Sequence, residues 1–275
     1  MYTRIHPRLI RKSDGVPCGL HGGVRKILEK NSLYNEDCLF LMDYIDDKSV
    51  DCIIADMPYE QTAQNEWDII IPFEPMWEQY SRIIKDNGAI LLFANGMFTA
   101  RLICSNPGMW RYNLVWEKTQ PSGFLNAGRM PLRAHEDICV FYKKLPVYHP
   151  QMVDGVRKIS TAEHKRNSKK GTDYGDYQFS SYDSDKRYPR SVLKFPKDTQ
   201  KSAIHPTQKP VALIEYLIRT YTDPGNLILD PCAGSMTTAI AAYKTGRKYI
   251  CIEKDQKNFQ KGCNRIWEYI QDQSL

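Results

Sequence analysis

Regular alternation of strand-like and helix-like segments is the feature that most constrains how this 275-residue chain folds. Short apolar runs with strand character are separated by longer segments with helical periodicity. Strands separated by helices form a mostly parallel sheet with helices on both faces. The sequence therefore predicts an α/β fold with a doubly wound, Rossmann-like sheet. We expect strands at 33–35, 50–55, 89–93, 112–116, 138–142, 226–229 and 248–252, and helices at 38–44, 74–84, 97–105, 210–221, 237–244 and 256–270.

The alternation stops between residues 146 and 204, where Lys, Ser, Asp, Tyr and Gly are frequent. A stretch of this length is too long for an ordinary loop and indicates an insertion with a function. We expect a basic N-terminal extension at 1–30, a main domain formed by 31–145 and 205–275, and an insert at 146–204. The extension is either a basic arm on a polyanion or a simple addition to the fold.

Positive charge is concentrated in two segments of a chain whose net charge is +6. Residues 1–30 carry seven Lys and Arg against two Asp and Glu, and residues 151–204 carry twelve against seven. Two basic segments on a slightly acidic body indicate a polyanionic partner, although a solvated basic surface has the same balance.

Composition excludes several classes of protein. No apolar stretch is long enough to span a bilayer, and no apolar segment follows the basic N-terminus as in a signal peptide. The eight cysteines form no C-x-x-C pair, and no Cys/His cluster has metal-ligand spacing. We therefore expect a cytoplasmic protein with reduced, buried cysteines, no membrane partner and no metal.

Two short motifs carry chemistry, and each directly follows a predicted strand. The first comprises residues 56–59, Asp-Met-Pro-Tyr, and the second comprises residues 230–235, Asp-Pro-Cys-Ala-Gly-Ser. Ligands of doubly wound sheets bind at the carboxyl ends of the strands. Gly234 permits close backbone approach, and the following helix offers free N–H groups. Glu253 ends the next strand, where a carboxylate commonly holds a ribose diol.

Together these motifs resemble those of the DNA amino-methyltransferases, which methylate an exocyclic nitrogen. The catalytic tetrapeptide precedes the cofactor motif, an order similar to the circularly permuted beta group and especially to small adenine methylases of phages and mobile elements. The resemblance covers residues 33–270 approximately and implies S-adenosyl-L-methionine as cofactor. It implies methylation of adenine N6 in double-stranded DNA at a specific short sequence, as in restriction-modification.

The resemblance also implies a role for each residue of the tetrapeptide. Asp56 would accept one N–H of the target amino group, and the backbone carbonyl of Met57 would accept the other. Pro58 fixes the turn, and Tyr59 would stack on the base and stabilise the charge that develops on nitrogen. The target base must leave the duplex to reach this pocket.

A larger set of residues is implied at the cofactor. Asp37 would contact adenine or serve as a helix N-cap, two roles that the sequence leaves open. Cys232 and Met236 stand where the family usually has Phe and Gly, and a Met resists positive φ. The hexapeptide 205–210 resembles the segment that holds the methionine portion of the cofactor. The implied residues are Asp37, Cys38, His205, Thr207, Gln208, Lys209, Asp230, Pro231, Cys232, Ala233, Gly234, Ser235, Glu253 and Lys254.

By the same resemblance, the insert is the target-recognition region. It mixes cations suited to phosphates with aromatic side chains suited to unstacked bases, and a solvated loop is the competing interpretation. A homodimer and a cognate restriction enzyme stay open as partners beside double-stranded DNA. The residues expected at DNA are Lys165, Arg166, Lys169, Lys170, Arg187, Tyr188 and Arg190.

Three alternatives to adenine methylation of DNA remain. An N4-cytosine methylase uses the same chemistry, but its tetrapeptide usually begins with Ser, so Asp56 favours adenine. A catalytically inactive DNA-binding homologue and an RNA substrate also agree with the motifs. A C5-cytosine methylase lacks a suitably placed Pro-Cys nucleophile, and no G-x-G-x-x-G supports an NAD-dependent oxidoreductase.

Overall fold

The computed structural model describes residues 8–10, 27–59, 70–163, 181–198 and 208–273. The chain divides into two compact units, which we call the main unit (1–149 and 191–275) and the hairpin unit (150–190). The expected insert at 146–204 is wider than the hairpin unit at both ends.

A nine-stranded sheet forms the centre of the described part of the main unit, in the order β1-β2-β11-β10-β3-β4-β6-β5-β9. From β1 to β4 neighbouring strands are parallel, β6 runs antiparallel to both β4 and β5, and β9 is parallel to β5. The predicted mostly parallel sheet is thus confirmed. The strands are β1 (Arg8–Ile10), β2 (Ser32–Tyr34), β3 (Val50–Ala55), β4 (Ile84–Ala94), β5 (Trp110–Ser122), β6 (Arg133–Phe141), β9 (Val192–Phe195), β10 (Leu227–Asp230) and β11 (Lys248–Ile252).

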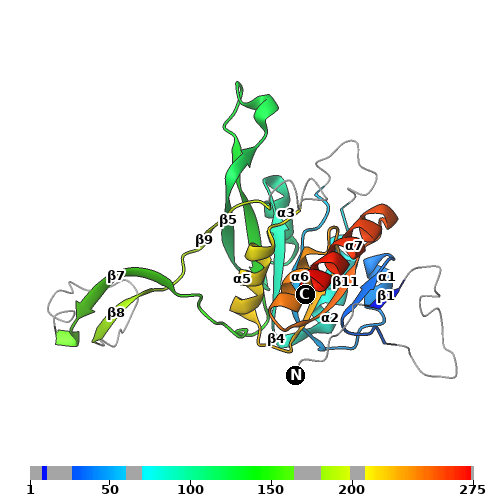
Figure 1. Ribbon diagram of the computed structural model, residues 1–275, viewed down its shortest axis with the longest axis horizontal. Helices are drawn as coiled ribbons and strands as arrows, with labels where there is room; N and C mark the ends of the chain where they lie inside the picture. The colour runs from blue at the N-terminus through cyan, green and yellow to red at the C-terminus, as the bar shows by residue number, and fades with distance from the viewer. Residues whose placement is uncertain (1–7, 11–26, 60–69, 164–180, 199–207, 274–275) are drawn as a thin grey trace. The chain divides into compact units, whose positions relative to one another are not determined.

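Helices cover both faces of this sheet (Figure 1). One apolar layer joins the strands to the first three helices, and the other joins them to the last three. Successive residues of a strand point to opposite faces, so Ile53 and Ala55 enter the first layer, while Cys52 and Ile54 enter the second. Burial on both sides explains why β3 is almost continuously apolar. The helices are α1 (Cys38–Met42), α2 (Phe73–Ile83), α3 (Met97–Ser105), α5 (Val211–Tyr221), α6 (Thr237–Lys244) and α7 (Gln256–Asp272).

The sheet has a topological switch point between β10 and β3. From β10 the chain passes through α6 to β11 on one side, and from β3 it passes through α2 to β4 on the other. Residues of α6 and α2 belong to opposite apolar layers. The chain ends of β10 and β3 therefore diverge, which leaves a crevice at the carboxyl edge of the sheet where ligands bind.

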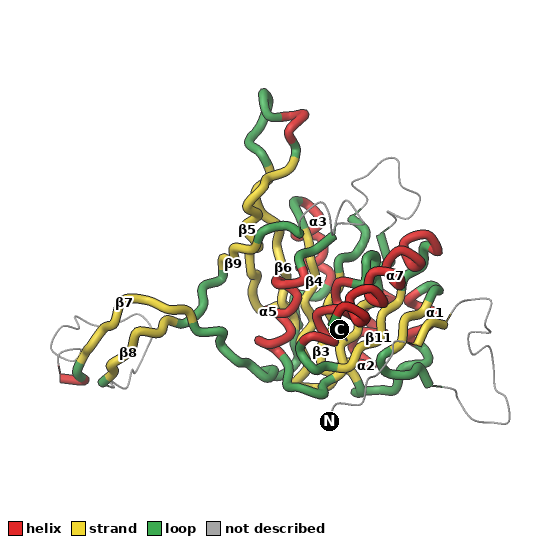
Figure 2. The backbone as a smooth tube through the Cα atoms, viewed as in Figure 1, coloured by secondary structure: helices red, strands yellow, loops and turns green. Residues whose placement is uncertain are grey.

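Strands β5 and β6 form an antiparallel hairpin that extends past the core of the sheet (Figure 2). The sequence predicts strands only at 112–116 and 138–142, because the outer halves of β5 and β6 carry exposed side chains without apolar alternation. A one-turn 3₁₀ helix, η2 (Phe124–Asn126), lies at the tip of this hairpin.

The hairpin unit contains two antiparallel strands, β7 (Val153–Ser160) and β8 (Tyr182–Arg187). The sequence predicts an irregular segment here, whereas the structure contains these two strands. Every residue of both strands is at least partly exposed, so the strands give no periodic apolar signal in the sequence. A two-pronged ion pair joins them, in which Arg157 donates to the Asp183 carboxylate at 2.7 and 2.6 Å.

Seven cysteines in the described ranges are free thiols, and most of them are buried. Cys104 is exposed, so the expectation of burial is wrong for this residue, which lies at the end of α3. In the same ranges no group of three or more His, Cys, Asp or Glu side chains is placed to hold a metal ion, and no helix is long and apolar enough to cross a membrane.

Candidate active site

A cavity of about 730 Å³ opens at the carboxyl ends of β2, β3, β10 and β11, at the switch point of the sheet. Every predicted catalytic and cofactor residue that the structure describes lines it, and their roles stay predictions. These residues are Asp37, Cys38, Asp56, Met57, Pro58, Tyr59, Gln208, Lys209, Asp230, Pro231, Cys232, Ala233, Gly234, Ser235, Glu253 and Lys254.

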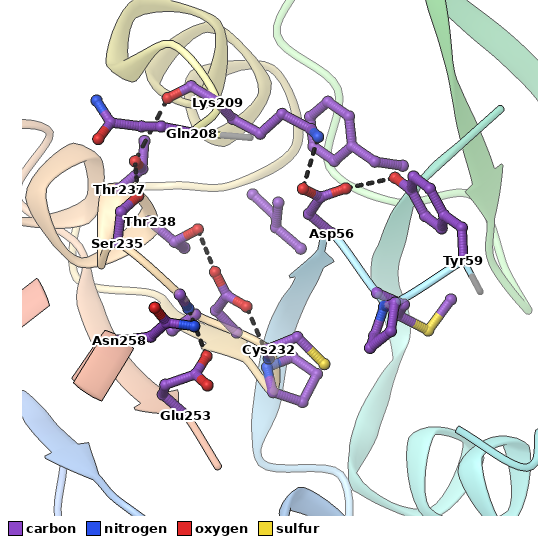
Figure 3. Close-up of a pocket in the computed structure, with 18 of the residues that line it drawn as sticks. Asp56, Tyr59, Gln208, Lys209, Cys232, Ser235, Thr237, Thr238, Glu253 and Asn258 are labelled. Atoms are coloured by element: carbon purple, nitrogen blue, oxygen red, sulfur yellow. Dashed lines mark hydrogen bonds and ion pairs between the residues drawn. The ribbon is translucent and has the colours of Figure 1, made fainter. Parts of the chain in front are cut away.

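Asp56 follows the last residue of β3 and stands between two donors (Figure 3). Its Oδ2 accepts a hydrogen bond from Lys209 Nζ at 2.5 Å, and its Oδ1 accepts one from the Tyr59 hydroxyl. The Tyr59 ring packs on Phe98 with ring centroids 4.8 Å apart. Both carboxylate oxygens are therefore held in fixed directions on the cavity wall.

Lys209 also forms an ion pair with Glu136, at 3.1 Å, and Glu136 pairs with Lys118 at 2.5 Å. Burial alone would raise the pKa of Glu136, but Lys209 and Lys118 outweigh it and hold that pKa below its usual value. Burial opposes the charge on Lys209, yet Asp56 and Glu136 raise its pKa above the ordinary value. The sequence assigns Lys209 to the cofactor, whereas its ammonium group lies at Asp56.

Glu136 and Lys118 are absent from the predicted site. Glu136 on β6 lies opposite Trp116 on β5, two residues before Lys118, and both charged residues line the cavity. Segments 116–119 and 131–137, which contain them, fit the family resemblance, but no role is predicted for either residue, because their proximity depends on the register of two strands separated by the hairpin tip.

The turn after β10 is organised by a buried carboxylate. Asp230 Oδ1 accepts from the Cys232 N–H at 3.0 Å, and Oδ2 accepts from the Thr238 hydroxyl at 2.5 Å. Burial raises the pKa of Asp230 to about 7, against the lowering effect of these two hydrogen bonds. Asp230 thus shapes the turn from beneath, and its charge depends on pH near neutrality.

Glu253 connects the end of β11 to the same turn. Its Oε2 accepts from the Gly234 N–H and its Oε1 from the Asp255 N–H, both at 2.8 Å. Burial raises the pKa of Glu253 more than these backbone bonds lower it. Glu253 thus presents a carboxylate with fixed oxygens on the cavity wall, and its contact with a ribose diol stays a prediction.

Met236 adopts the left-handed conformation, with φ 57°, that its counterpart Gly would adopt freely. Its side chain is fully buried. Space for it comes from Gly262 in α7, where an added Cβ would lie 2.6 Å from Met236 Cγ and 2.8 Å from Gly234 O. Left-handed strain of about 1–2 kcal/mol is smaller than the 2–5 kcal/mol typical of removing a buried Met side chain, so packing offsets the strain.

Asp37 is the N-cap of α1, where its Oδ1 accepts from the Leu39 N–H at 2.9 Å. Its Oδ2 forms an ion pair with Lys254 at 3.1 Å. The N-cap alternative is confirmed, and the adenine contact stays a prediction for a residue that still lines the cavity.

Arg265 in α7 is a further residue that sequence motifs do not indicate. Its guanidinium donates to Ser235 O at 2.9 Å and to Thr237 Oγ1 at 2.8 Å, and it pairs with Asp198 at 3.2 Å. Gln208 donates to the same Asp198 carboxylate at 2.7 Å. Arg265 therefore links the start of α6 to the segment that precedes α5.

The remaining predicted residues divide by position. His205, Thr207, Lys165, Arg166, Lys169 and Lys170 lie outside the described residues. Arg187 is turned onto carbonyl groups of its own hairpin, donating to Ser184 and Lys186. Tyr188 and Arg190 are exposed.

Charge is divided between two parts of the cavity wall. The part near the turn after β10 carries Asp37, Asp230, Glu253 and Asp255 against one cation, Lys254. The other part carries four cations, namely Lys118, Arg133, Lys197 and Lys209, against two carboxylates, Asp56 and Glu136. The first part suits a cationic ligand, and the second suits a polyanion such as nucleic acid.

The fold and this cavity define an α/β protein that binds its ligands at a topological switch point. A sequence profile of the N6/N4 DNA methylases matches residues 50–262, and the chain belongs to this family of DNA methyltransferases.

Two curated relatives come from Moraxella bovis. Type II methyltransferase M2.MboI is 26% identical over 270 residues, covering 87% of this chain and 89% of the relative. Type II methyltransferase M1.MboII is 29% identical over 267 residues, covering 89% and 95%.

Solved structures share the fold. M1.HpyAVI, solved as a complex with SAM, has a TM-score of 0.56 at 23% identity and covers 85% of this chain and 98% of its own. The cytosine-N4-specific PvuII DNA methyltransferase has a TM-score of 0.61 at 16% identity and covers 90% and 92%. At these identities the likeness supports the Rossmann-like methyltransferase fold alone.

The raised pKa of Asp230 predicts a pH dependence of stability. A folded pKa of about 7, against an ordinary value of about 3.9, means that the folded state binds the proton more tightly. The contribution of Asp230 to the free energy of unfolding is fully present below about pH 4 and is lost as the pH rises through about 7. The loss amounts to at most about 4 kcal/mol. Asp230→Asn can keep both hydrogen bonds, with its amide N–H₂ donating to Thr238, and should remove this loss.

The measurement is the free energy of unfolding by urea at several pH values between 5 and 8, for wild type and Asp230→Asn. We expect the free energy of unfolding of Asp230→Asn to increase relative to that of wild type as pH rises. Parallel curves would contradict the assignment of a raised pKa to Asp230.

Proposed function

We propose that this DNA methyltransferase transfers a methyl group to the exocyclic N6 of adenine in double-stranded DNA, at a specific short sequence. The observation that carries the proposal is Asp56, whose carboxylate lies on the wall of the cavity that the cofactor turn also lines. The N4-cytosine enzymes that share this chemistry usually begin the tetrapeptide with Ser, and an Asp at this position supports adenine.

S-adenosyl-L-methionine is the cofactor that family membership implies. The cavity of about 730 Å³ has room for it, and the predicted cofactor turn lines that cavity. When bound, it supplies a methyl group on a sulfonium whose departure needs no covalent enzyme intermediate. Glu253 would accept from the ribose diol. The excess of carboxylates near the turn after β10 favours a ligand that carries positive charge.

Asp56 would orient the target amino group. The N6 lone pair of adenine is delocalised into the ring, and acceptors aimed at both N–H groups concentrate it on nitrogen. The Asp56 carboxylate can accept one N–H, and the backbone carbonyl of Met57 the other. A negative group here also stabilises the positive charge that develops on nitrogen as the new bond forms.

The ion pair between Lys209 and Asp56 suggests how the pocket accepts the base. Lys209 donates to Oδ2 of Asp56 and also pairs with Glu136. When the target amino group takes the place of Lys209 at Asp56, the charge of the lysine therefore keeps Glu136 as its partner. The Tyr59 hydroxyl holds the other oxygen of Asp56 in place. The target base would reach this position only after it has flipped out of the duplex.

Asp56→Asn tests the central role. Loss of the negative charge should lower the methyl-transfer rate on the order of 100-fold, while the dissociation constant for S-adenosyl-L-methionine changes by less than about two-fold. Single-turnover transfer to DNA and calorimetric titration of the cofactor provide the two values. Asp47→Asn, at an exposed carboxylate paired with Arg82, is the control. Loss of cofactor binding in Asp56→Asn would contradict the assignment.

Gly262→Ala tests whether the turn around Gly234 holds the cofactor. The added Cβ would press on the backbone oxygen of Gly234, which cannot move independently of the turn. Overpacking of about 1–3 kcal/mol at this place should weaken cofactor binding by about ten-fold or more.

Calorimetric titration of S-adenosyl-L-methionine measures this effect. Gly108→Ala is the matched control, because its Cβ would meet nothing closer than 4.0 Å. A Gly262→Ala protein that folds and binds the cofactor as tightly as wild type would remove Gly234 from the cofactor site.

A further inference from the structure

The tip of the β5–β6 hairpin exposes apolar side chains on a turn with regular hydrogen bonding. Phe124 is 82% and Leu125 98% exposed, and Met130 is also largely exposed. Gly123, with φ 91°, starts the turn, and N–H groups of Asn126 and Ala127 donate to the carbonyls of Gly123 and Phe124 at 2.9 and 3.0 Å. The backbone thus fixes these side chains in water, which is unfavourable unless a partner covers them.

The same hairpin reaches the cavity. Ser122 and Arg133, which pair with each other at the base of the tip, both line it together with Asp56. Figure 2 shows the hairpin extending beyond the rest of the sheet, with the short helix η2 at its end. A duplex whose base enters this cavity therefore passes close to the tip.

Charge identifies the kind of partner. The segment from Lys118 to Arg133 contains three cations and no Asp or Glu; Lys118 is paired with Glu136, which leaves Arg129 and Arg133 for a partner. Lys197 adds a fourth cation on the cavity wall, where burial and the neighbouring Lys118 lower its pKa. Apolar side chains surrounded by cations match a DNA duplex, whose stacked bases lie between two lines of phosphates.

We propose that Phe124 and Leu125 form an apolar wedge that enters the DNA duplex and fills the space left by the base that moves to Asp56. Apolar side chains that insert between base steps offset the cost of unstacking with new contacts to the bases. Arg129 and Arg133 would contact the flanking phosphates. This proposal rests on the proposed function, because it assumes that a base leaves the duplex for this cavity.

The test compares two DNA duplexes that carry the site methylated by the wild-type protein. In one the target adenine is paired with thymine, and in the other it lies opposite an abasic position, where flipping costs less. The double variant Phe124→Ser/Leu125→Ser is compared with wild type in single-turnover methylation of both duplexes. Leu145→Ser is the matched control, since Leu145 is 77% exposed and does not line the cavity.

We expect the double variant to methylate the paired duplex at least about ten-fold more slowly than wild type, but the abasic duplex within about two-fold of it. The control should match wild type on both. The wedge would be overturned if the double variant and wild type methylate the paired duplex at equal rates, or if the double variant loses the same factor on both duplexes. In either case methylation of adenine by wild type would leave the proposed function intact. A wild-type protein that methylates no adenine in DNA, and therefore provides no site for these duplexes, would overturn both proposals.

Sedimentation velocity separates the wedge from a contact between two copies of the chain. The wedge requires wild type and the double variant to have the same oligomeric state. A wild-type dimer that becomes a monomer in the double variant would overturn the wedge and assign the tip to self-association.

Discussion

A buried lysine between two carboxylates is the interaction on which the active site depends. Lys209, Asp56 and Glu136 come from the segment before α5, the end of β3 and the middle of β6, and only the folded sheet brings them together. Removing one partner of a buried pair typically costs about 3–5 kcal/mol, because the other charge remains without compensation. The same charges that hold these three segments together fix the direction of the Asp56 carboxylate on the cavity wall.

The topology explains why the predicted cofactor motif and the predicted catalytic tetrapeptide line one cavity. At the switch point between β10 and β3 the chain leaves in opposite directions, so the turn with Asp230 and the turn with Asp56 face the same space. The carboxylates near β10 and the cations near β6 give the two parts opposite electrostatic character. Methyl transfer needs both ligands in contact while each keeps its own binding surface.

Much of this could be predicted from the sequence, and the rest depends on tertiary pairing. The helices at 97–105 and 237–244 and the strands at 50–55 and 248–252 have the predicted bounds, because burial gives them a strong apolar signal. The outer hairpin of β5 and β6 and the strands β7 and β8 lack that signal. Motif spacing predicted Asp56 and Glu253 as site residues, and both line the cavity, but the ammonium of Lys209 lies at Asp56, and no role is predicted for Glu136 or Arg265.

The most direct test of the account identifies the base that is modified. Unmethylated DNA is incubated with the pure protein and S-adenosyl-L-methionine, digested to nucleosides and examined by mass spectrometry. The account predicts N6-methyladenine, because Asp56 provides the acceptor suited to the adenine amino group. N4-methylcytosine as the product would contradict that central claim while leaving the fold and the family unchanged.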